Sequence, residues 1–287
     1  MNQVGLFNDM TNEDYHKAPG LSFSALKAFS ATPAHYQAYL RKERTETASQ
    51  RLGTLVHMRT LEPDQYATKV AIVDGNRNSN AVKAQIEEAQ AKGLYVCKTD
   101  EHDLACRMSD AVIASTIVFP NGDRIRVGEL LAHPDGVMES SIFWMETVEV
   151  QGSPDEEPQE IPLLMKCRPD FMLPKQGLIL DLKTFSDLSD RAIEKQVHNM
   201  KYHWQAQHYL RGLSSHFERP ANLCVHSFAT DEDPFLARSV FLDPASLEKA
   251  EYEMRPLIER FAVCQSKDEW PGYSEELSMI ALPSYAW

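Results

Sequence analysis

The sequence has no long hydrophobic run and no clustered cysteines. None of its 287 residues lies in an apolar stretch near the roughly 18 residues of a membrane span, and the polar residues 1–3 do not begin a secretory signal. The five cysteines are odd in number and scattered, without a Cys-x-x-Cys pair, which disfavours a zinc ribbon or a disulfide framework. We therefore expect a cytoplasmic protein that has no membrane partner and buries its cysteines as small apolar side chains.

Basic residues are also scarce. The chain has 29 Lys and Arg against 42 Asp and Glu, a formal net charge of -13, and a mean hydropathy of -0.40. Such a chain does not bind nucleic acid indiscriminately, because neutralising phosphates requires clustered basic residues. One stretch, the basic lobe, does hold six basic residues against two acids: Lys27, Arg41, Lys42, Arg44, Arg51 and Arg59. It fits an enzyme that threads DNA along one path, although a solvated helical face explains the same charges.

The chain contains no internal repeat, low-complexity segment or long linker, so we expect residues 1–287 to form one domain. Residues 1–130 are predicted to form a helical lobe, and residues 131–287 a sheet with its flanking helices. Hydrophobic spacing predicts helices over 50–61, 80–92, 102–118, 189–211 and 244–264, and strands over 136–149, 223–228 and 237–241. This order predicts an α/β fold with a mixed central sheet flanked by helices.

Two apolar runs flank a turn signal at residues 174–177 and therefore predict a β-hairpin. If these four residues form the loop, Leu173 faces Leu178, and the same count places Asp170 opposite Asp181. Directly opposed residues of an antiparallel pair share a face, with Cβ atoms about 5 Å apart. The sequence thus predicts two neighbouring carboxylates.

The same register sets Arg168 opposite Lys183 and turns four apolar side chains to the other face: Cys167, Phe171, Leu180 and Leu182. Two carboxylates that close repel each other, and a divalent metal between them relieves the repulsion, with Lys183 beside it to meet developing negative charge. A charged hairpin is commonly only the solvated edge of a sheet. Here the charged positions are short acids and a lysine between core residues, which favours a metal-binding pocket.

Several segments together resemble a known family. The Pro-Asp pair at 169–170, followed by Asp-Leu-Lys at 181–183, is similar to the signature of the PD-(D/E)xK nuclease superfamily. The Gly-x-x-x-His pattern at 53–57 resembles a helix of its RecB-like and lambda-exonuclease-like branches. Residues 139–144 resemble the acid-bearing strand that precedes the hairpin, and 205–209 the Gln-x-x-x-Tyr helix that follows it. The sequence is most similar to the nuclease domain of the exodeoxyribonuclease VIII (RecE-type) family, and the resemblance covers nearly the whole chain.

The resemblance implies a Mg²⁺ site, at which Mn²⁺ substitutes, formed by Asp170 and Asp181 with help from three further groups: His57, Glu139 and the backbone carbonyl of Leu182. Without the resemblance, His57 is more simply a hydrogen-bonded core histidine, and Glu139 an acid at the end of a strand. Lys183 is implied to orient the attacking water and to stabilise the charged phosphate.

The resemblance also assigns contacts with DNA. Gln205 and Tyr209 are implied to face the active site and contact the DNA strand. Lys201, Gln205 and Tyr209 recur every four residues, so they are predicted to line one stripe of a single long helix. A polar stripe of this kind is also common at the edge of any amphipathic helix.

Ser22, Ser24 and Lys27 begin a predicted helix, where unpaired N–H groups favour an anion. Ordinary capping explains the two serines equally well. Because the resembled enzymes must grip a 5′ end, we expect phosphate contacts from these residues, from Lys201 and from three arginines of the basic lobe: Arg41, Arg44 and Arg51.

The function implied is a Mg²⁺-dependent exodeoxyribonuclease that degrades linear double-stranded DNA processively from 5′ to 3′ and leaves 3′ overhangs for recombination. The implied partners are DNA ends, a single-strand annealing protein and further copies of the chain, with a tetramer favoured and a trimer as the other form. A restriction-type or structure-specific endonuclease uses the same residues. A non-catalytic DNA-binding module is disfavoured by the intact Asp170, Asp181 and Lys183.

Overall fold

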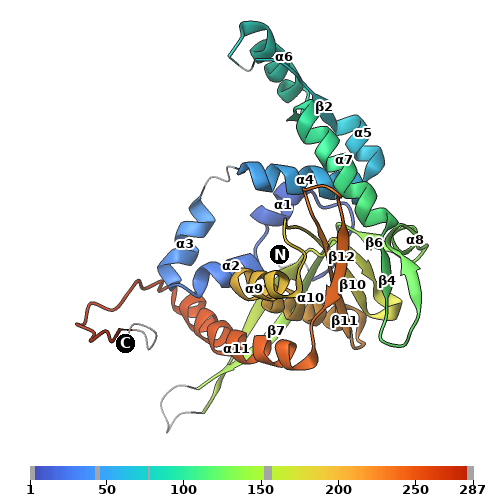
Figure 1. Cartoon of the computed structure of the whole chain (residues 1–287). Helices are drawn as coiled ribbons and strands as arrows, with labels where there is room; N and C mark the ends of the chain where they lie inside the picture. Colours follow the sequence, from blue (N-terminus) through green and yellow to red (C-terminus); the bar gives the residue numbers. More distant parts are fainter. Residues whose placement is uncertain (1–3, 43–45, 77, 152–156, 283–287) are drawn as a thin grey trace.

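The computed structural model describes residues 4–42, 46–76, 78–151 and 157–282, and within them two main sheets are surrounded by helices (Figure 1). The larger sheet has five strands in the order β12-β11-β10-β9-β6. Their bounds are Ala237–Phe241, Leu223–Ala229, Leu178–Thr184, Phe171–Leu173 and Val137–Met138. β10 and β11 are parallel, and the other neighbours are antiparallel. The predicted α/β architecture with a mixed central sheet is confirmed.

The second sheet is antiparallel and has the order β1-β7-β8, with bounds Gly5–Phe7, Ser141–Val150 and Gln159–Cys167. The chain crosses between the two sheets twice, at residues 139–140 and at residues 168–170. The two crossings touch, because the Glu139 backbone N–H donates to the Asp170 carbonyl over 2.9 Å. Two of the predicted site acids therefore lie where the sheets meet.

The first part of the chain is mostly helical, as predicted: α1 (Asn12–Lys17), α2 (Phe23–Phe29), α3 (Pro33–Arg41), α4 (Ala48–Leu61), α5 (Pro63–Lys69), α6 (Asn80–Ala91), α7 (Thr99–Ala114) and α8 (Val127–Leu131). It also holds two small pairs of strands, β2 (Val70–Ile72) with β3 (Tyr95–Cys97), and β4 (Thr116–Val118) with β5 (Arg124–Arg126). α5, α6 and part of α7 extend from the body as an arm (Figure 1). α4 packs against α7 and reaches the large sheet at β10.

The large sheet has a separate hydrophobic cluster on each face. α10 (Tyr202–Phe217) and α11 (Pro244–Lys267) share one cluster with Ile179 of β10, and α4 and α7 share the other with Leu180 and Leu182. Side chains alternate along a strand, so Asp181 and Lys183 lie on the face of Ile179, toward α10. All five cysteines were predicted to be buried, and four of them are; Cys106 is half-buried. In the described part of the chain, no helix has the length and apolar character needed to cross a membrane.

Three element predictions were wrong in their bounds. The strand predicted over 136–149 is broken at residues 139–140, and the helix predicted over 102–118 ends at Ala114, before β4. The long helix predicted over 189–211 is two helices, α9 (Asp190–Met200) and α10, separated by Lys201 in the left-handed conformation with φ 61°. Gly212 does not end α10. It lies against Trp144 and Cys167, where a Cβ atom would meet Cys167 Sγ at 2.7 Å.

The hairpin prediction was right at its turn and wrong at its base. Leu173 pairs with Leu178, and the loop is a 3₁₀ turn, Pro174–Gln176, closed by Gly177 with φ 64°. β9 begins only at Phe171, however, and residues before it belong to the crossing between sheets. Arg168 therefore does not face Lys183, and Cys167 packs in the cluster of α10 rather than beside Phe171. Proline at 169 has no backbone N–H for a strand ladder, which explains the interruption.

Candidate active site

Asp170 lies one residue before β9 and is almost fully buried. Its Oδ2 accepts a hydrogen bond of 2.6 Å from the backbone N–H of Leu182 on β10. The same oxygen lies 3.5 Å from Nδ1 of His57 on α4. Both described contacts of this carboxylate thus fall on Oδ2, which leaves Oδ1 for a ligand.

His57 joins the helical lobe to this site, as the sequence predicts. Its Nε2 lies 3.2 Å from the backbone carbonyl of Leu182, which is itself a predicted metal ligand. Burial alone would lower the pKa of His57, but Asp170 and then Glu139 raise it to about 9. The imidazole is held between two of the oxygen atoms that the sequence assigns to a metal.

Glu139 completes a cluster with His57 and Asp170, in which one possible ligand atom of each residue lies within 4.8 Å of the others. Glu139 occupies the first crossing between sheets with φ 45°, a conformation rare outside glycine. Its Oε2 accepts a hydrogen bond of 3.1 Å from Nε of Arg168. Burial, followed by the nearby Asp170, raises the pKa of Glu139 to about 7. Arg168, which was predicted to lie opposite Lys183, therefore binds Glu139.

Asp181 is fully buried on β10 and has two cationic or donor partners, Lys183 and His226. Lys183 Nζ forms an ion pair with Asp181 Oδ2, and His226 Nδ1 lies 3.1 Å from the same oxygen. Burial would raise the pKa of Asp181, but Lys183 and the His226 hydrogen bond hold it well below its usual range. Burial would lower the pKa of Lys183, but the negative charges of Asp181 and Asp170 raise it above its ordinary value.

Gln205 and Tyr209 lie one turn apart on α10, and Gln205 Nε2 donates to the Tyr209 hydroxyl over 2.9 Å. Burial, with the nearby negative charges of Asp181 and Asp170, raises the pKa of Tyr209 well above its usual range. Gln205 Oε1 is buried and has no hydrogen-bond partner within the part of the chain that the structure describes. Tyr209 therefore lies near enough to Asp181 and Asp170 to be affected by their charge, and Gln205 is joined to it. Their contact with DNA stays a prediction.

The predicted phosphate contacts at the start of the chain are not gathered at this site. Ser22 accepts the backbone N–H of Ala25 over 3.3 Å as the N-cap of α2, and Ser24 is exposed. Lys27 donates to the Met200 carbonyl at the end of α9 over 3.0 Å. Lys27 thus stabilises the break between α9 and α10.

Lys201 does not lie on one helical stripe with Gln205, because it forms that break. Its Nζ lies 3.7 Å from Glu253 Oε2 and 5.1 Å from the ring centre of Trp204. Arg51 forms two bonds of 2.8 Å to Glu101, whereas the exposed Arg41 donates from Nε to the Gln37 carbonyl over 3.2 Å. Arg44 lies outside the described residues. In the basic lobe, the charge of Arg51 is therefore neutralised by an acid of α7.

Sequence reasoning missed two residues that adjoin Asp181 and Lys183. His226 lies on β11 in register with Asp181. Tyr202 begins α10, and Lys183 Nζ lies 4.9 Å from the centre of its ring. His226 could have been found from the sequence, because it is a polar residue inside the apolar run 223–228. Nothing in the sequence marked the break at Lys201 that places Tyr202.

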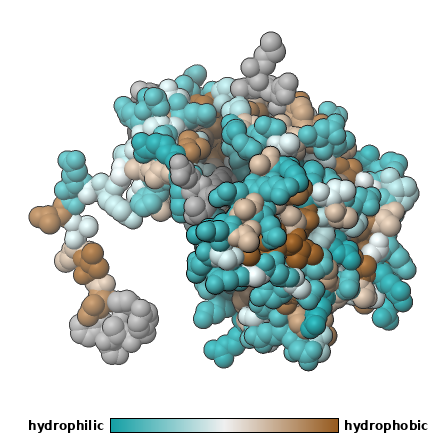
Figure 2. Space-filling model, turned by 90° about the horizontal axis from the view of Figure 1, so that it is seen from above, coloured by the Kyte–Doolittle hydropathy of each residue, from teal (hydrophilic) through white to brown (hydrophobic). Residues whose placement is uncertain are grey.

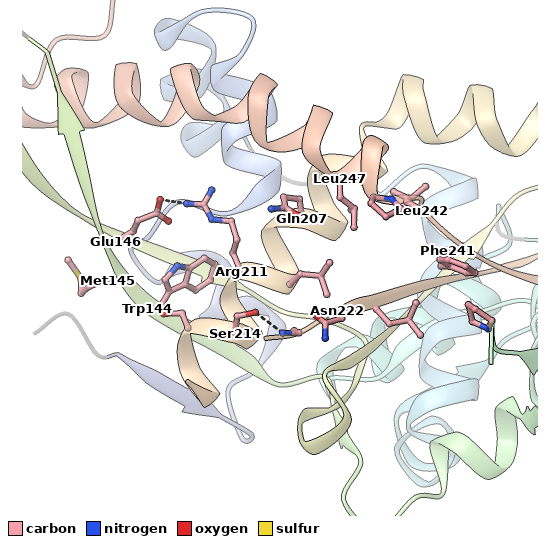
Figure 3. Close-up of a pocket in the computed structure, with 16 residues that line it drawn as sticks. Trp144, Met145, Glu146, Gln207, Arg211, Ser214, Asn222, Phe241, Leu242 and Leu247 are labelled. Carbon is pink, nitrogen blue, oxygen red and sulfur yellow. Dashed lines mark hydrogen bonds and ion pairs between the residues drawn. The ribbon is translucent and has the colours of Figure 1, made fainter. Parts of the chain in front are cut away.

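A separate pocket of about 710 Å³ lies between β7, α10, β12 and the start of α11 (Figure 3). Arg211 forms an ion pair with Glu146 there, and both polar residues such as Ser214 and apolar residues such as Phe241 line the rest. None of the predicted site residues lines this pocket. Its charged groups join α10, α11 and β7 and belong to the framework of the domain.

The donor set at the junction fits a hard divalent cation. Asp170 and Glu139 offer carboxylates and His57 an imidazole in one cluster, with the Leu182 backbone carbonyl beside His57. Asp181 is not a member of this cluster, and its described contacts are with Lys183 and His226. Oxygen donors of this kind suit Mg²⁺ and Mn²⁺, and the imidazole suits Mn²⁺. A site that uses neither thiolates nor several histidines does not resemble a structural zinc centre.

A mixed sheet with this acid-and-lysine arrangement defines a domain of the PD-(D/E)xK class. Residues 22–283 match the family described as PDDEXK-like domain of unknown function (DUF3799), and the chain belongs to this family. A crystal structure of a candidate exonuclease from Eubacterium rectale has a TM-score of 0.57 and 17% sequence identity, and the match covers 91% of this chain and 88% of that chain. At this identity the likeness shows the fold alone.

A second solved structure, SSO0001, is 12% identical over 88% of each chain, with a TM-score of 0.28 that says nothing about the fold. No curated protein matches the sequence. The family and the fold confirm the predicted PD-(D/E)xK resemblance and support a nuclease.

Proposed function

We propose that this chain is a divalent-metal-dependent DNA nuclease with its active site at Asp170, Asp181 and Lys183. The observation that carries the proposal is that only one oxygen of each of the two carboxylates, Asp170 and Asp181, has described protein contacts. Each is buried, and the described contacts of each fall on Oδ2. Both Oδ1 atoms are left for a metal, and a lysine stands beside Asp181.

The metal would be held by Asp170, Asp181 and the Leu182 carbonyl, with His57 and Glu139 at its edge. When bound, Mg²⁺ or Mn²⁺ would lower the pKa of a water molecule and neutralise charge on the phosphate oxygens. Lys183 orients the attacking water and stabilises the phosphate as its negative charge grows. Gln205 and Tyr209 hold the DNA strand against this centre.

We further propose that the substrate is the end of linear double-stranded DNA, degraded processively from 5′ to 3′ to leave 3′ overhangs for recombination. The RecE-type resemblance supports this, as does the exonuclease description of the Eubacterium rectale protein. Residues 1–287 would act as one cytoplasmic nuclease domain, together with an annealing protein. Of the predicted phosphate contacts, the exposed Arg41 would bind the DNA backbone directly, whereas Arg51 would have to leave Glu101 first.

Assembly into a ring of identical chains, four by the resemblance and three as the other form, would keep the acidic domain on its DNA. The segment after α11 supports such assembly. It extends away from the body (Figure 2) and exposes four apolar side chains: Leu277, Met279, Ile280 and Leu282. Exposed apolar residues in one segment are typical of a surface that another chain covers.

The experiment compares linear and covalently closed circular duplex DNA of one sequence in the presence of Mg²⁺. An exonuclease degrades the linear form and leaves the circle intact. Nicking of the circle would instead assign the chain to the restriction-type or structure-specific endonucleases on the same residues. Asp181→Asn, purified in the same way, is the control: any cleavage that persists in this variant comes from a contaminating nuclease.

A further inference from the structure

His226 is a buried histidine to which the chemistry above assigns no role. It lies on β11 in register with Asp181 of the parallel neighbour β10 and with Val240 of β12 on the other side. Its side chain is fully buried, and Nδ1 lies 3.1 Å from Asp181 Oδ2. Because β11 is hydrogen-bonded on both sides, the imidazole stands beside the carboxylate on a rigid interior strand.

The hydrogen bond determines the tautomer of His226. An ionised carboxylate only accepts, so Nδ1 carries the proton. Nε2 is buried and, within the described residues, has no hydrogen-bond partner. An unpaired buried nitrogen opposes folding. An apolar side chain would fill the same space without this penalty, so packing alone does not explain a histidine here.

A second donor reaches the same oxygen. Lys183 Nζ contacts Asp181 Oδ2, and Tyr202 covers both donors, with its ring centre 4.9 Å from Lys183 Nζ and 5.7 Å from the His226 ring centre. Tyr202 can take this place because α9 ends at Met200 and Tyr202 begins α10 after the break at Lys201. Two donors from adjacent strands, meeting on one oxygen, restrain rotation of the carboxylate.

We propose that His226 is a positioning residue that, by donating from Nδ1 to Oδ2, holds the Asp181 carboxylate so that Oδ1 is presented to the catalytic divalent metal. This inference rests on the metal-dependent nuclease proposed above. His226 itself contacts neither the metal nor the DNA. Partners that orient a metal-binding side chain in this way typically change metal affinity or activity by about 10–100-fold when they are removed.

The test measures Mn²⁺ binding to full-length variants by calorimetric titration, and the Tm of each variant with and without Mn²⁺. His226→Leu removes the donor and keeps the apolar volume. His226→Asn places an amide N–H near the position of Nδ1 and retains the donor. His208→Gln is the matched control, because His208 is also fully buried but bonds through Nε2 to the Lys166 carbonyl over 2.9 Å.

We expect His226→Leu to bind Mn²⁺ about 10–100-fold more weakly, and to require correspondingly more metal for cleavage. His226→Asn and His208→Gln should bind close to the wild-type affinity. Wild-type affinity in His226→Leu, alongside normal binding by the wild-type chain, overturns the positioning role and leaves the nuclease proposal standing. Absence of Mn²⁺ binding by the wild-type chain overturns both.

If His226→Leu does not fold, His226→Gln replaces it. The longer side chain carries its amide toward the position of Nε2, away from Asp181, so Mn²⁺ binding should be weak in His226→Gln and normal in His226→Asn. Equal binding by these two variants contradicts the inference. The metal-free Tm separates a loss of folding from a loss of metal affinity.

Discussion

His57 of the helical lobe lies against Asp170 at the junction of the two sheets, with His57 Nδ1 3.5 Å from Asp170 Oδ2. Asp170 is held from the other side by the Leu182 N–H, and His57 by the Leu182 carbonyl. One residue of β10 thus contacts both partners through its backbone. The consequence is that the proposed metal ligands from distant parts of the sequence are positioned by main-chain atoms of a central strand.

Lys183 is expected to act on the chemical step. Its Nζ is directed at Asp181 and bounded by Tyr202, so it is placed inside the site rather than along a DNA path. Lys183→Met should lower the single-turnover cleavage rate by about 10²–10³-fold, the usual loss for one preorganised electrostatic group. DNA affinity, measured in Ca²⁺ without cleavage, should change little. A loss confined to affinity would reassign Lys183 to phosphate binding.

The basic lobe should contribute unevenly to DNA binding. Arg41 is exposed, whereas the Arg51 guanidinium must first leave Glu101 before it can contact a phosphate. Arg41→Gln should weaken binding and reduce the slope of log affinity against log salt by about one. Arg51→Gln should leave the slope nearly unchanged and serves as the charge-matched control. Equal slopes for both variants and the wild-type chain would show that the basic lobe is an ordinary solvated face that does not bind DNA.

His208 should make the fold sensitive to acid. It is fully buried on α10, and burial lowers its pKa to about 4 from an ordinary value near 6.5. Below pH 6.5 the unfolded chain binds the proton first, so stability falls as pH drops from about 6.5 to about 4, by roughly 3 kcal/mol in total. Urea unfolding at pH 7 and pH 4.5 measures this loss. His208→Gln should reduce it, and an equal loss in the variant and the wild-type chain would contradict the assignment.

The apolar segment after α11 should be covered by a second copy of the chain. Light scattering is expected to return a mass three or four times the 32.6 kDa of one chain. Replacing Leu277 and Ile280 by serine should shift the assembly toward the monomer and shorten the tract digested per binding event. A wild-type mass near one chain, together with long processive tracts, would contradict the ring.

Much of the fold could be predicted from the sequence because the determining signals are local. Turn residues at 174–177 fixed the pairing of Leu173 with Leu178, and the apolar periodicity of α4, α6 and α11 marked those helices. The chemistry of the site was also local, since Asp181 and Lys183 lie two residues apart on one strand. The resemblance to the PD-(D/E)xK superfamily then added His57 and Glu139.

The remaining features depend on contacts between distant segments. The crossings at residues 139–140 and 168–170 exist because two sheets meet there. β6 and β9 are too short for a sequence pattern to indicate where either strand begins or ends. Lys201 adopts a left-handed conformation where Lys27 binds the last carbonyl of α9. α10 continues through Gly212, whose tight packing against Trp144 and Cys167 cannot be predicted from its neighbours in sequence.

Metal-dependent hydrolysis of end-labelled linear duplex DNA tests the central claim most directly, using the wild-type chain, Asp170→Asn and Asp181→Asn. Asparagine retains an acceptor for the Leu182 N–H or the His226 donor, so the fold should persist, as circular dichroism can verify. We predict cleavage by the wild-type chain that requires Mg²⁺ or Mn²⁺. The cleavage rate should fall by more than about 100-fold in each variant, a larger loss than the removal of a residue that only orients a metal ligand causes. Wild-type cleavage in a chelator, or by either variant, would contradict the account.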